Sequence, residues 1–170
     1  MSPLVRRTWS PRGQTPVLRQ RGRSRRKVSV IAALVISPQR RRVRAHFGFL
    51  PDANYDGGAI LSFLKGLSRA VRGPIELIWD RLRAHHRGPA GVWLARSRRV
   101  RAHLLPPYAP ELNPVELIWG HAKMNPLANF APTELQELLR RTQRVTRDMA
   151  GNQPLLRAFI RHGSLPLRLR

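Results

Sequence analysis

The sequence predicts a mixed α/β fold in which helices cover one sheet. The run Val28–Ile36 is apolar and rich in β-branched residues, which is typical of a buried strand. Residues 59–71 space their apolar side chains along one face of a helix. Strand-like and helix-like segments then alternate toward the C-terminus. The chain has 170 residues, of which 42% are hydrophobic, so it is long enough to bury a core and suits one compact unit.

The first half of the chain predicts an arm followed by a hairpin. Residues 1–27 scatter proline and glycine among arginines, which favours short extended pieces and turns over a long helix. Residues 27–37 read as a buried strand because they are too short and too uniformly apolar for a surface helix. After the turn at Ser37–Pro38, residues 41–49 alternate in polarity and predict a second strand that pairs antiparallel with the first.

The second half predicts helices that alternate with short strands. The helix over residues 59–71 ends at Gly73–Pro74, and a short apolar strand over residues 74–79 follows and stops at Asp80. Asn113–Pro114 begins a helix whose apolar stripe, which includes Trp119, predicts core packing. The remaining expected elements are a short helix over 89–97, a strand over 100–105, a proline-rich loop over 106–110 and a long helix over 133–150. The predicted order is therefore β-β-α-β-α-β-α-α.

Positive charge dominates the composition and points to a nucleic-acid partner. The chain carries 32 lysine and arginine residues against 9 aspartate and glutamate residues, a net charge of +23, and only Lys27, Lys65 and Lys123 are lysines. Arginine grips phosphate oxygens with a planar fork. The first 50 residues hold thirteen basic residues and no acid, since Asp52 is the first. Three clusters could form a DNA-binding face or be ordinary solvated surface: Arg21–Lys27, Arg40–Arg44 and Arg96–Arg101.

Several classes of site and location are excluded or disfavoured. The chain has no cysteine, so disulfides and cysteine–zinc sites are excluded, and its six histidines show no metal-site spacing. The longest apolar stretch, Val28–Ile36, is nine residues, whereas a membrane span takes roughly 20. No secretory leader opens the sequence. We therefore expect no membrane partner and a cytoplasmic protein.

Acidic residues are so scarce that Asp80 and Glu116 each support two interpretations. Asp80 closes an apolar strand, so its carboxylate either lies at the sheet edge where open α/β folds bind ligands or caps the following turn. Glu116 falls at the third helical position after Asn113–Pro114, which is the pattern of a capping box. Spacing alone favours the structural interpretation of Glu116.

The segment around Glu116 closely resembles a known catalytic signature. The string from Leu105 to Trp119, followed by Lys123, resembles the region around the last catalytic acid of DDE-type transposases, specifically the bacterial insertion-sequence branch of the mariner superfamily. Residues 79–85, from Trp79 and Asp80 to His85, resemble that family's segment around its second catalytic Asp. Asp80 and Glu116 are separated by 35 residues, similar to the family's usual separation. Residues 8–16 and the strand over 27–36 also resemble the family, so the similarity covers nearly the whole chain.

The resemblance implies a fold, a chemistry and roles for single residues. It implies a ribonuclease H-like mixed sheet flanked by helices, which holds three carboxylates that bind two Mg²⁺ (or Mn²⁺) ions and act on DNA phosphates. Asp80 would be the second and Glu116 the third catalytic metal ligand. His85 would be a helper near the site or a DNA contact, although solvated histidines are common after such a turn. The implied partner is double-stranded DNA at transposon ends.

One departure from the family pattern lowers the expected activity. The family's first catalytic Asp lies on a strand shortly before the Trp that Trp9 resembles, and here eight residues precede Trp9 and none is acidic. Asp52 and Asp56 follow the second strand and predict solvated turn residues. We therefore expect a sheet that lacks the first strand, and a DDE fragment that is inactive alone.

The same departure sets the expected organisation. It consists of a truncated DDE endonuclease domain over residues 1–130 and a C-terminal helical extension over 131–170. A second polypeptide or an upstream reading frame could supply the absent part. Related transposases act as dimers or larger assemblies on paired DNA ends, which makes a homodimer one expected assembly.

Two alternatives to the transposase interpretation remain. One is a non-catalytic basic nucleic-acid-binding protein, whose binding would be sensitive to salt but indifferent to Mg²⁺ and to substitution of Asp80 or Glu116. The other is an organelle protein with an arginine-rich transit peptide, although the prolines and glycines in residues 1–27 disfavour its amphipathic helix. Neither alternative explains the proline-rich loop that leads into Glu116.

Overall fold

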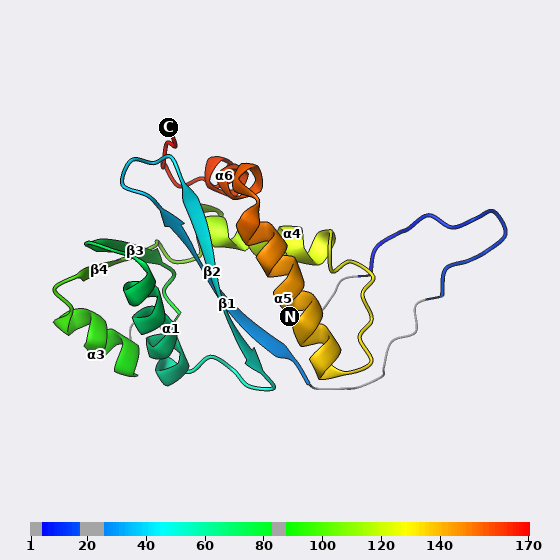
Figure 1. Cartoon of the computed structure of the whole chain (residues 1–170), viewed down its shortest axis with the longest axis horizontal. Coiled ribbons are helices and arrows are strands. Elements are labelled where there is room, and N and C mark those ends of the chain that lie inside the picture. Colours follow the sequence, from blue (N-terminus) through cyan, green and yellow to red (C-terminus); the bar gives the residue numbers. More distant parts are fainter. Residues whose placement is uncertain (1–4, 18–25, 83–87) are drawn as a thin grey trace.

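The computed structural model describes residues 5–17, 26–82 and 88–170 of the chain (Figure 1). Within these ranges the segment 5–17 contains no helix or strand, in agreement with the proline- and glycine-rich sequence. The strands are β1 (Val28–Ile36), β2 (Val43–Pro51), β3 (Ile75–Trp79) and β4 (Val100–Leu104). The helices are α1 (Gly57–Ala70), α3 (Gly88–Arg96), the 3₁₀ turn η1 (Pro110–Leu112), α4 (Pro114–Met124), α5 (Leu135–Gly151) and α6 (Gln153–His162).

The predicted hairpin is confirmed. β1 and β2 pair antiparallel along their whole length, from Val28 opposite Pro51 to Ile36 opposite Val43. The connecting turn follows Ser37, whose hydroxyl oxygen accepts hydrogen bonds from the backbone N–H groups of Arg41 and Arg42. Because side chains alternate across a strand, the hairpin presents one set of residues to each of its two faces.

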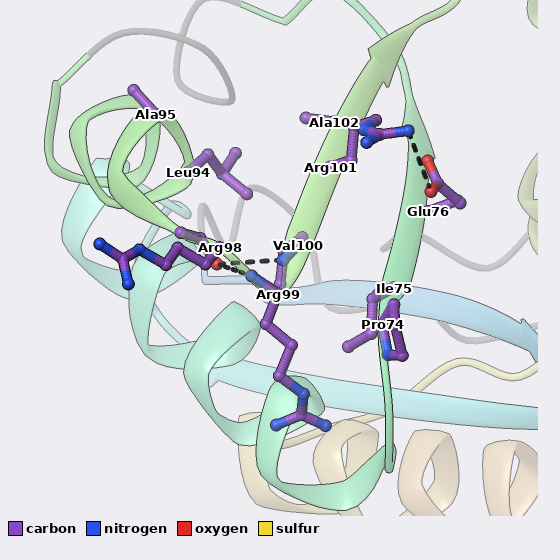
Figure 2. Close-up of a pocket in the computed structure, with 11 residues that line it drawn as sticks. Pro74, Ile75, Glu76, Leu94, Ala95, Arg98, Arg99, Val100, Arg101 and Ala102 are labelled. Atoms are coloured by element: carbon purple, nitrogen blue, oxygen red, sulfur yellow. Dashed lines mark hydrogen bonds and ion pairs between the residues drawn. The ribbon is translucent and has the colours of Figure 1, made fainter.

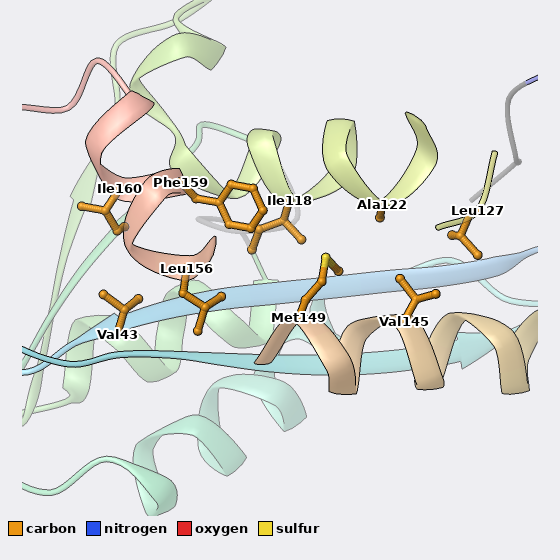
Figure 3. Packing of buried hydrophobic residues seen from close by; sticks show 9 residues of the cluster. All are labelled: Val43, Ile118, Ala122, Leu127, Val145, Met149, Leu156, Phe159 and Ile160. Atoms are coloured by element: carbon orange, nitrogen blue, oxygen red, sulfur yellow. The ribbon is translucent and has the colours of Figure 1, made fainter. Parts of the chain in front are cut away.

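One face of the hairpin packs against the three C-terminal helices (Figure 3). Val43 of β2, Ile118 of α4 and Leu156 of α6 are each fully buried there. Trp119 of α4 makes an edge-to-face contact with Phe47 of β2, so the predicted apolar stripe of this helix does pack into the core. The buried set is Val43, Ile118, Ala122, Leu127, Val145, Met149, Leu156, Phe159 and Ile160.

The opposite face of the hairpin meets α1, which also covers the second pair of strands. Ile31 of β1 and Leu77 of β3 pack against one small cluster, whose buried members are Ile60, Leu64 and Ala90. Gly48 of β2 lies so close to α1 that an added Cβ would come 3.1 Å from the Phe63 ring. The hairpin is therefore the middle layer between α1 and the helices α4, α5 and α6.

The strands form two small sheets, whereas the sequence analysis expected one. β1 pairs only with β2, and β3 pairs in parallel with β4, with Ile75 opposite Val100 and Trp79 opposite Leu104. Among the described residues no strand pairs with the second edge of β1 or of β3. The shared helix α1 holds the two sheets together through side chains, not through a continuous hydrogen-bond ladder. The mixed α/β class with flanking helices, consistent with a ribonuclease H-like fold, is confirmed.

The C-terminal part differs from expectation in its number of helices. One long helix was predicted over 133–150, and the structure has α5 to Gly151 followed by a separate α6. Asn152 ends α5 and begins α6, because its side-chain oxygen accepts a hydrogen bond from the Leu155 N–H group at 3.0 Å. The Gln153 side chain bonds both backbone groups of Val43, which fixes the start of α6 against β2. Both helices share one core with α4. The domain boundary expected between residues 130 and 131 stays a prediction.

Candidate active site

A pocket lies where β3 and β4 end and α4 begins. Its volume is about 410 Å³. The side chains of Asp80 and Glu116 both line it, although 35 residues separate them in the sequence. The lining residues are Asp80, Arg81, Leu105, Pro106, Pro107, Tyr108, Ala109, Pro110, Asn113 and Glu116. The structure thus brings together the two acids that the sequence analysis selected.

Asp80 reaches this pocket because β3 and β4 are parallel. Their carboxyl ends lie side by side, and the Leu105 N–H group donates to the Trp79 carbonyl oxygen at 2.8 Å, so the ladder continues to the last residue of β3. Asp80 follows immediately and is partly buried. Its carboxylate also accepts a hydrogen bond from the Leu82 N–H group at 3.0 Å. Asp80 therefore caps the next turn and also lies at the carboxyl edge of the sheet, and its role as a metal ligand stays a prediction.

Arg81 brings a positive charge into the lining of the pocket that holds the two acids. Its Nε donates to the Leu105 carbonyl oxygen at 2.9 Å, which ties the chain after β3 to the chain after β4. The residue is exposed and lines the same pocket as Asp80 and Glu116. A guanidinium held in this way offers its remaining N–H groups to an anionic ligand such as a phosphate.

Glu116 stands on the first turn of α4 with its carboxylate in solvent. Asn113 caps the helix, because its side-chain oxygen accepts from the Val115 N–H group at 3.2 Å, and Pro114 takes the first helical position. The second half of the predicted capping box is wrong: the Asn113 N–H group donates to the Pro110 carbonyl oxygen at 2.9 Å. Within the described residues the Glu116 carboxylate makes no hydrogen bond or ion pair, so it remains available to a ligand in the pocket.

The proline-rich loop lines the pocket together with the two acids. Pro106, Pro107 and Pro110 restrict its backbone, and η1 closes it before α4. The C-terminal segment supports the loop from behind, since the Ser164 N–H group donates to the Glu111 carbonyl oxygen at 2.9 Å. Sequence reasoning missed this support, because a bond between backbone groups more than 50 residues apart leaves no local pattern.

Two acids do not make a complete metal site. Mg²⁺ and Mn²⁺ prefer oxygen ligands, so Asp80 and Glu116 fit such an ion in kind. Across residues 5–17, 26–82 and 88–170, however, no group of three His, Asp or Glu side chains could hold a metal ion. Asp52 is a turn residue that pairs with Arg26 at 3.2 Å, whereas Asp56 is the N-cap of α1, and neither lines the pocket. His85, the predicted helper, lies outside the described residues.

None of the described members of the arginine clusters lines this pocket. The cluster Arg96–Arg101 borders a second cavity of about 420 Å³, which lies where β3 and β4 begin, at the opposite end of these strands (Figure 2). Arg99 there donates to the backbone oxygens of Val71 and Gly73 and so connects β4 to the end of α1. Arg101 lies 3.7 Å from the Glu76 carboxylate, which His103 also contacts. Arg96 and Arg98 are exposed and can meet a polyanion.

The cluster Arg40–Arg44 lies at the hairpin turn and the start of β2. The Arg41 carbonyl oxygen accepts a bond from Arg157, and the Arg40 carbonyl oxygen accepts one from Arg170, so the backbone of the hairpin turn holds the C-terminal end. The side chains of Arg40–Arg42 themselves are exposed. Of the cluster Arg21–Lys27, only Arg26 and Lys27 lie within the described residues.

Comparison with protein families decides the lineage. A family model described as DDE superfamily endonuclease matches residues 2–138, which include β1 to β4, the pocket and α4. The chain belongs to the DDE superfamily endonucleases. A comparison with curated proteins found no match.

Membership of the DDE superfamily gives the broad function. It supports a transposase-like nuclease domain that binds DNA, and DDE endonucleases typically use divalent metal ions. The match covers both Asp80 and Glu116 and ends early in α5. Among the described helices of this DDE endonuclease, none combines the length and apolarity needed to cross a bilayer.

Proposed function

We propose that this chain is a transposase-derived endonuclease domain in which Asp80 and Glu116 are two of the catalytic metal ligands. The observation that carries the proposal is their meeting in one pocket, one acid from the end of a strand and the other from the first turn of a helix. The solvent-facing carboxylate of Glu116 and the nearby Arg81 suit a site for a metal ion and a DNA phosphate. When bound, Mg²⁺ or Mn²⁺ would activate a water or 3′-hydroxyl for attack on that phosphate.

The chain's own residues supply binding and orientation in this proposal. Asp80 and Glu116 would hold the metal from two sides of the pocket, and the Asp80 turn bond to Leu82 fixes one carboxylate oxygen. Arg81, anchored on the Leu105 carbonyl oxygen, would bind the DNA phosphate and orient it toward the acids. Exposed arginines such as Arg96 and Arg98 would bind the flanking DNA backbone.

The finer assignment follows from the residues that match the family signature. The segment from Leu105 to Trp119 supports the insertion-sequence branch of the mariner superfamily, whose substrates are double-stranded transposon ends. That assignment carries with it a bacterial, nucleoid-associated location and assembly on paired DNA ends, with a homodimer as the simplest arrangement. We propose these as properties of the complete transposase.

We further propose that the third carboxylate comes from outside the described residues. No third His, Asp or Glu joins Asp80 and Glu116 there. Among the described strands, none pairs with the second edge of β1 or of β3, and a strand edge presents backbone N–H and C=O groups to which a further strand can add. A second polypeptide or an upstream reading frame would supply that strand, and without it we expect this chain to bind Mg²⁺ weakly and to leave DNA uncut.

Titration with Mn²⁺ tests the site directly. Bound Mn²⁺ broadens the NMR signals of nearby nuclei, so we expect selective loss of backbone signals around residues 80–82 and 113–117. Asp80→Asn or Glu116→Gln should weaken binding by about tenfold or more, in keeping with the loss of one of two ligands. Asp56→Asn is the matched control, because this acid caps α1 and lies outside the pocket lining. Uniform broadening, or equal loss with the control, would contradict the proposed site.

The second candidate is a non-catalytic nucleic-acid-binding protein. The net charge of +23 and the two-carboxylate pocket favour it. It predicts DNA affinity that falls steeply with salt but does not respond to Mg²⁺, to Asp80→Ala or to Glu116→Ala. A filter-binding series with and without Mg²⁺ separates it from the endonuclease domain. Cleavage of DNA ends by the purified chain, lost on Asp80→Ala, would instead exclude both this candidate and the expectation of inactivity.

A further inference from the structure

Tyr108 is the most exposed large side chain near the two acids. Its relative exposure is 102%, so no described part of the protein covers it. It lines the same pocket as Asp80 and Glu116. Among the described residues its ring makes no aromatic contact and its hydroxyl makes no hydrogen bond. The described part of the fold therefore does not use this ring for packing.

The backbone holds Tyr108 in an unfavourable conformation. Its φ is +57°, in the left-handed region that bulky residues rarely adopt. Pro107 precedes it, and η1 follows it with a hydrogen bond from the Leu112 N–H group to the Ala109 carbonyl oxygen at 3.2 Å. Such strain persists only where the surrounding chain enforces it, and it is common at functional sites. Here the restricted loop keeps an aromatic ring projecting into solvent beside the acids.

The chemistry around the ring favours a nucleobase as its ligand. The chain carries a net charge of +23, and Arg81 in the same pocket is suited to a phosphate. An aromatic ring beside a phosphate site can stack on a base of the same nucleotide strand, because every base has an aromatic face. Bases within an intact duplex are already stacked on both sides. The ring therefore fits a base that is unpaired or frayed.

We propose that Tyr108 stacks on an unpaired base next to the DNA phosphate bound at Asp80, Arg81 and Glu116. Tyr108 is a positioning residue in this proposal, which rests on the proposed function of the pocket. It predicts that the protein prefers a duplex with a short single-stranded end over a blunt duplex. The preference comes from the ring and not from the hydroxyl group.

The test compares two DNA probes on the full chain. One is a blunt duplex, and the other carries a three-nucleotide overhang that contains 2-aminopurine, a base whose fluorescence falls when an aromatic ring stacks on it. We expect the wild-type chain to quench the overhang probe and to bind it more tightly than the blunt duplex. Tyr108→Ala should abolish the quenching and weaken overhang binding on the order of tenfold, the usual effect of removing one stacking aromatic. Blunt-duplex affinity should change less than about twofold.

Rescue and control variants separate stacking from a structural role. Tyr108→Phe and Tyr108→Trp should keep the quenching, because they keep an aromatic face. Trp9→Ala is the matched control, since Trp9 is also fully exposed at 100%. Its segment, residues 5–17, is anchored through Arg6 to Met124, the last residue of α4, and to Asn129, whereas Glu116 lies on the first turn of that helix. We expect this variant to behave as wild type.

Each outcome decides the proposal. Unchanged quenching in Tyr108→Ala, or loss of quenching in Tyr108→Phe, would overturn it. If the chain binds blunt duplex and Mn²⁺ at the pocket but shows no overhang preference, the stacking inference fails while the proposed function stands. If Mn²⁺ does not bind near Asp80 and Glu116, the proposed function fails, and with it the role assigned to Tyr108.

Discussion

The two sheets of this molecule are supported to very different degrees. The β1–β2 hairpin is covered on both faces, by α1 on one side and by α4, α5 and α6 on the other (Figures 1 and 3). The β3–β4 pair packs against α1 and α3 on one face only. On its other face Ile78 is 42% exposed, and Glu76 lies in solvent with Arg101 and His103. The first sheet lies inside the larger core, whereas the second is covered on one face and meets the hairpin region through α1.

The candidate site draws one acid from each region. Glu116 stands on α4, whose Ile118 and Ala122 are buried in the larger core. Asp80 follows β3, whose Leu77 and Trp79 reach only the smaller cluster under α1. The distance between the two carboxylates therefore depends on how firmly the β3–β4 region is packed against α1. A ligand that bridges them would stabilise the β3–β4 region more than the hairpin region.

The largest expected effect tests the hairpin region. Leu156 of α6 is 0% exposed in the larger core. Leu156→Ala should lower the free energy of unfolding by about 3 kcal/mol, because it leaves a cavity among side chains that cannot all close in. Urea denaturation followed by circular dichroism measures this. Leu82→Ala, at a site that is 56% exposed, should change stability by less than about 0.5 kcal/mol.

A smaller effect is expected in the β3–β4 region. Leu64 of α1 is 5% exposed but packs among partly buried neighbours. Leu64→Ala should cost about 2 kcal/mol, since such a site relaxes more readily. Hydrogen exchange should show faster opening of β3 and β4 amides with little change in β1 and β2. Equal acceleration in both sheets would show that the molecule unfolds as one unit and would remove the contrast between the regions.

Release of strain beside the site should raise stability slightly. Tyr108 has a positive φ and no packing partner among the described residues, whereas asparagine tolerates this conformation well. Tyr108→Asn should raise the free energy of unfolding by about 0.5 kcal/mol, a fraction of the cost of the left-handed conformation. Thermal melting measures the change. A lowered melting temperature would mean that the ring contacts the protein and that the loop is not strained for function.

The smallest effect concerns pH and the α1 side of the hairpin. Burial, and secondly the charge of Arg44, lower the pKa of His46 below its ordinary value of 6.5. Between the lowered pKa and 6.5 the unfolded chain thus binds more protons than the folded one. The free energy of unfolding therefore falls as the pH falls through that window. Unfolding free energies at pH 7.5 and pH 5 should differ less in His46→Gln than in wild type. An equal or larger difference in the variant would contradict this.

Much of the fold follows from local pattern. The β-branched run gave β1, the alternating run gave β2, and the helical spacing of Ile60, Leu64 and Leu67 predicted α1 with few errors at its ends. The proline- and asparagine-based start of α4 was also predictable, because capping depends on adjacent residues. The break between α5 and α6 was not predicted, since the cap at Asn152 is one residue within an otherwise helical stretch.

The site shows most clearly where sequence reasoning stops. Scarcity of acids and the resemblance around Glu116 were enough to select Asp80 and Glu116, and only the parallel pairing of β3 with β4 placed both in one pocket. The direction in which the Asn113 N–H group donates, the support of the loop by Ser164 and the projection of Tyr108 depend on residues that meet through folding. The sequence by itself determined most of the helices and strands, the net charge and the two candidate acids. Tertiary structure decided the division into two sheets and the shape of the pocket, because both depend on packing between distant segments.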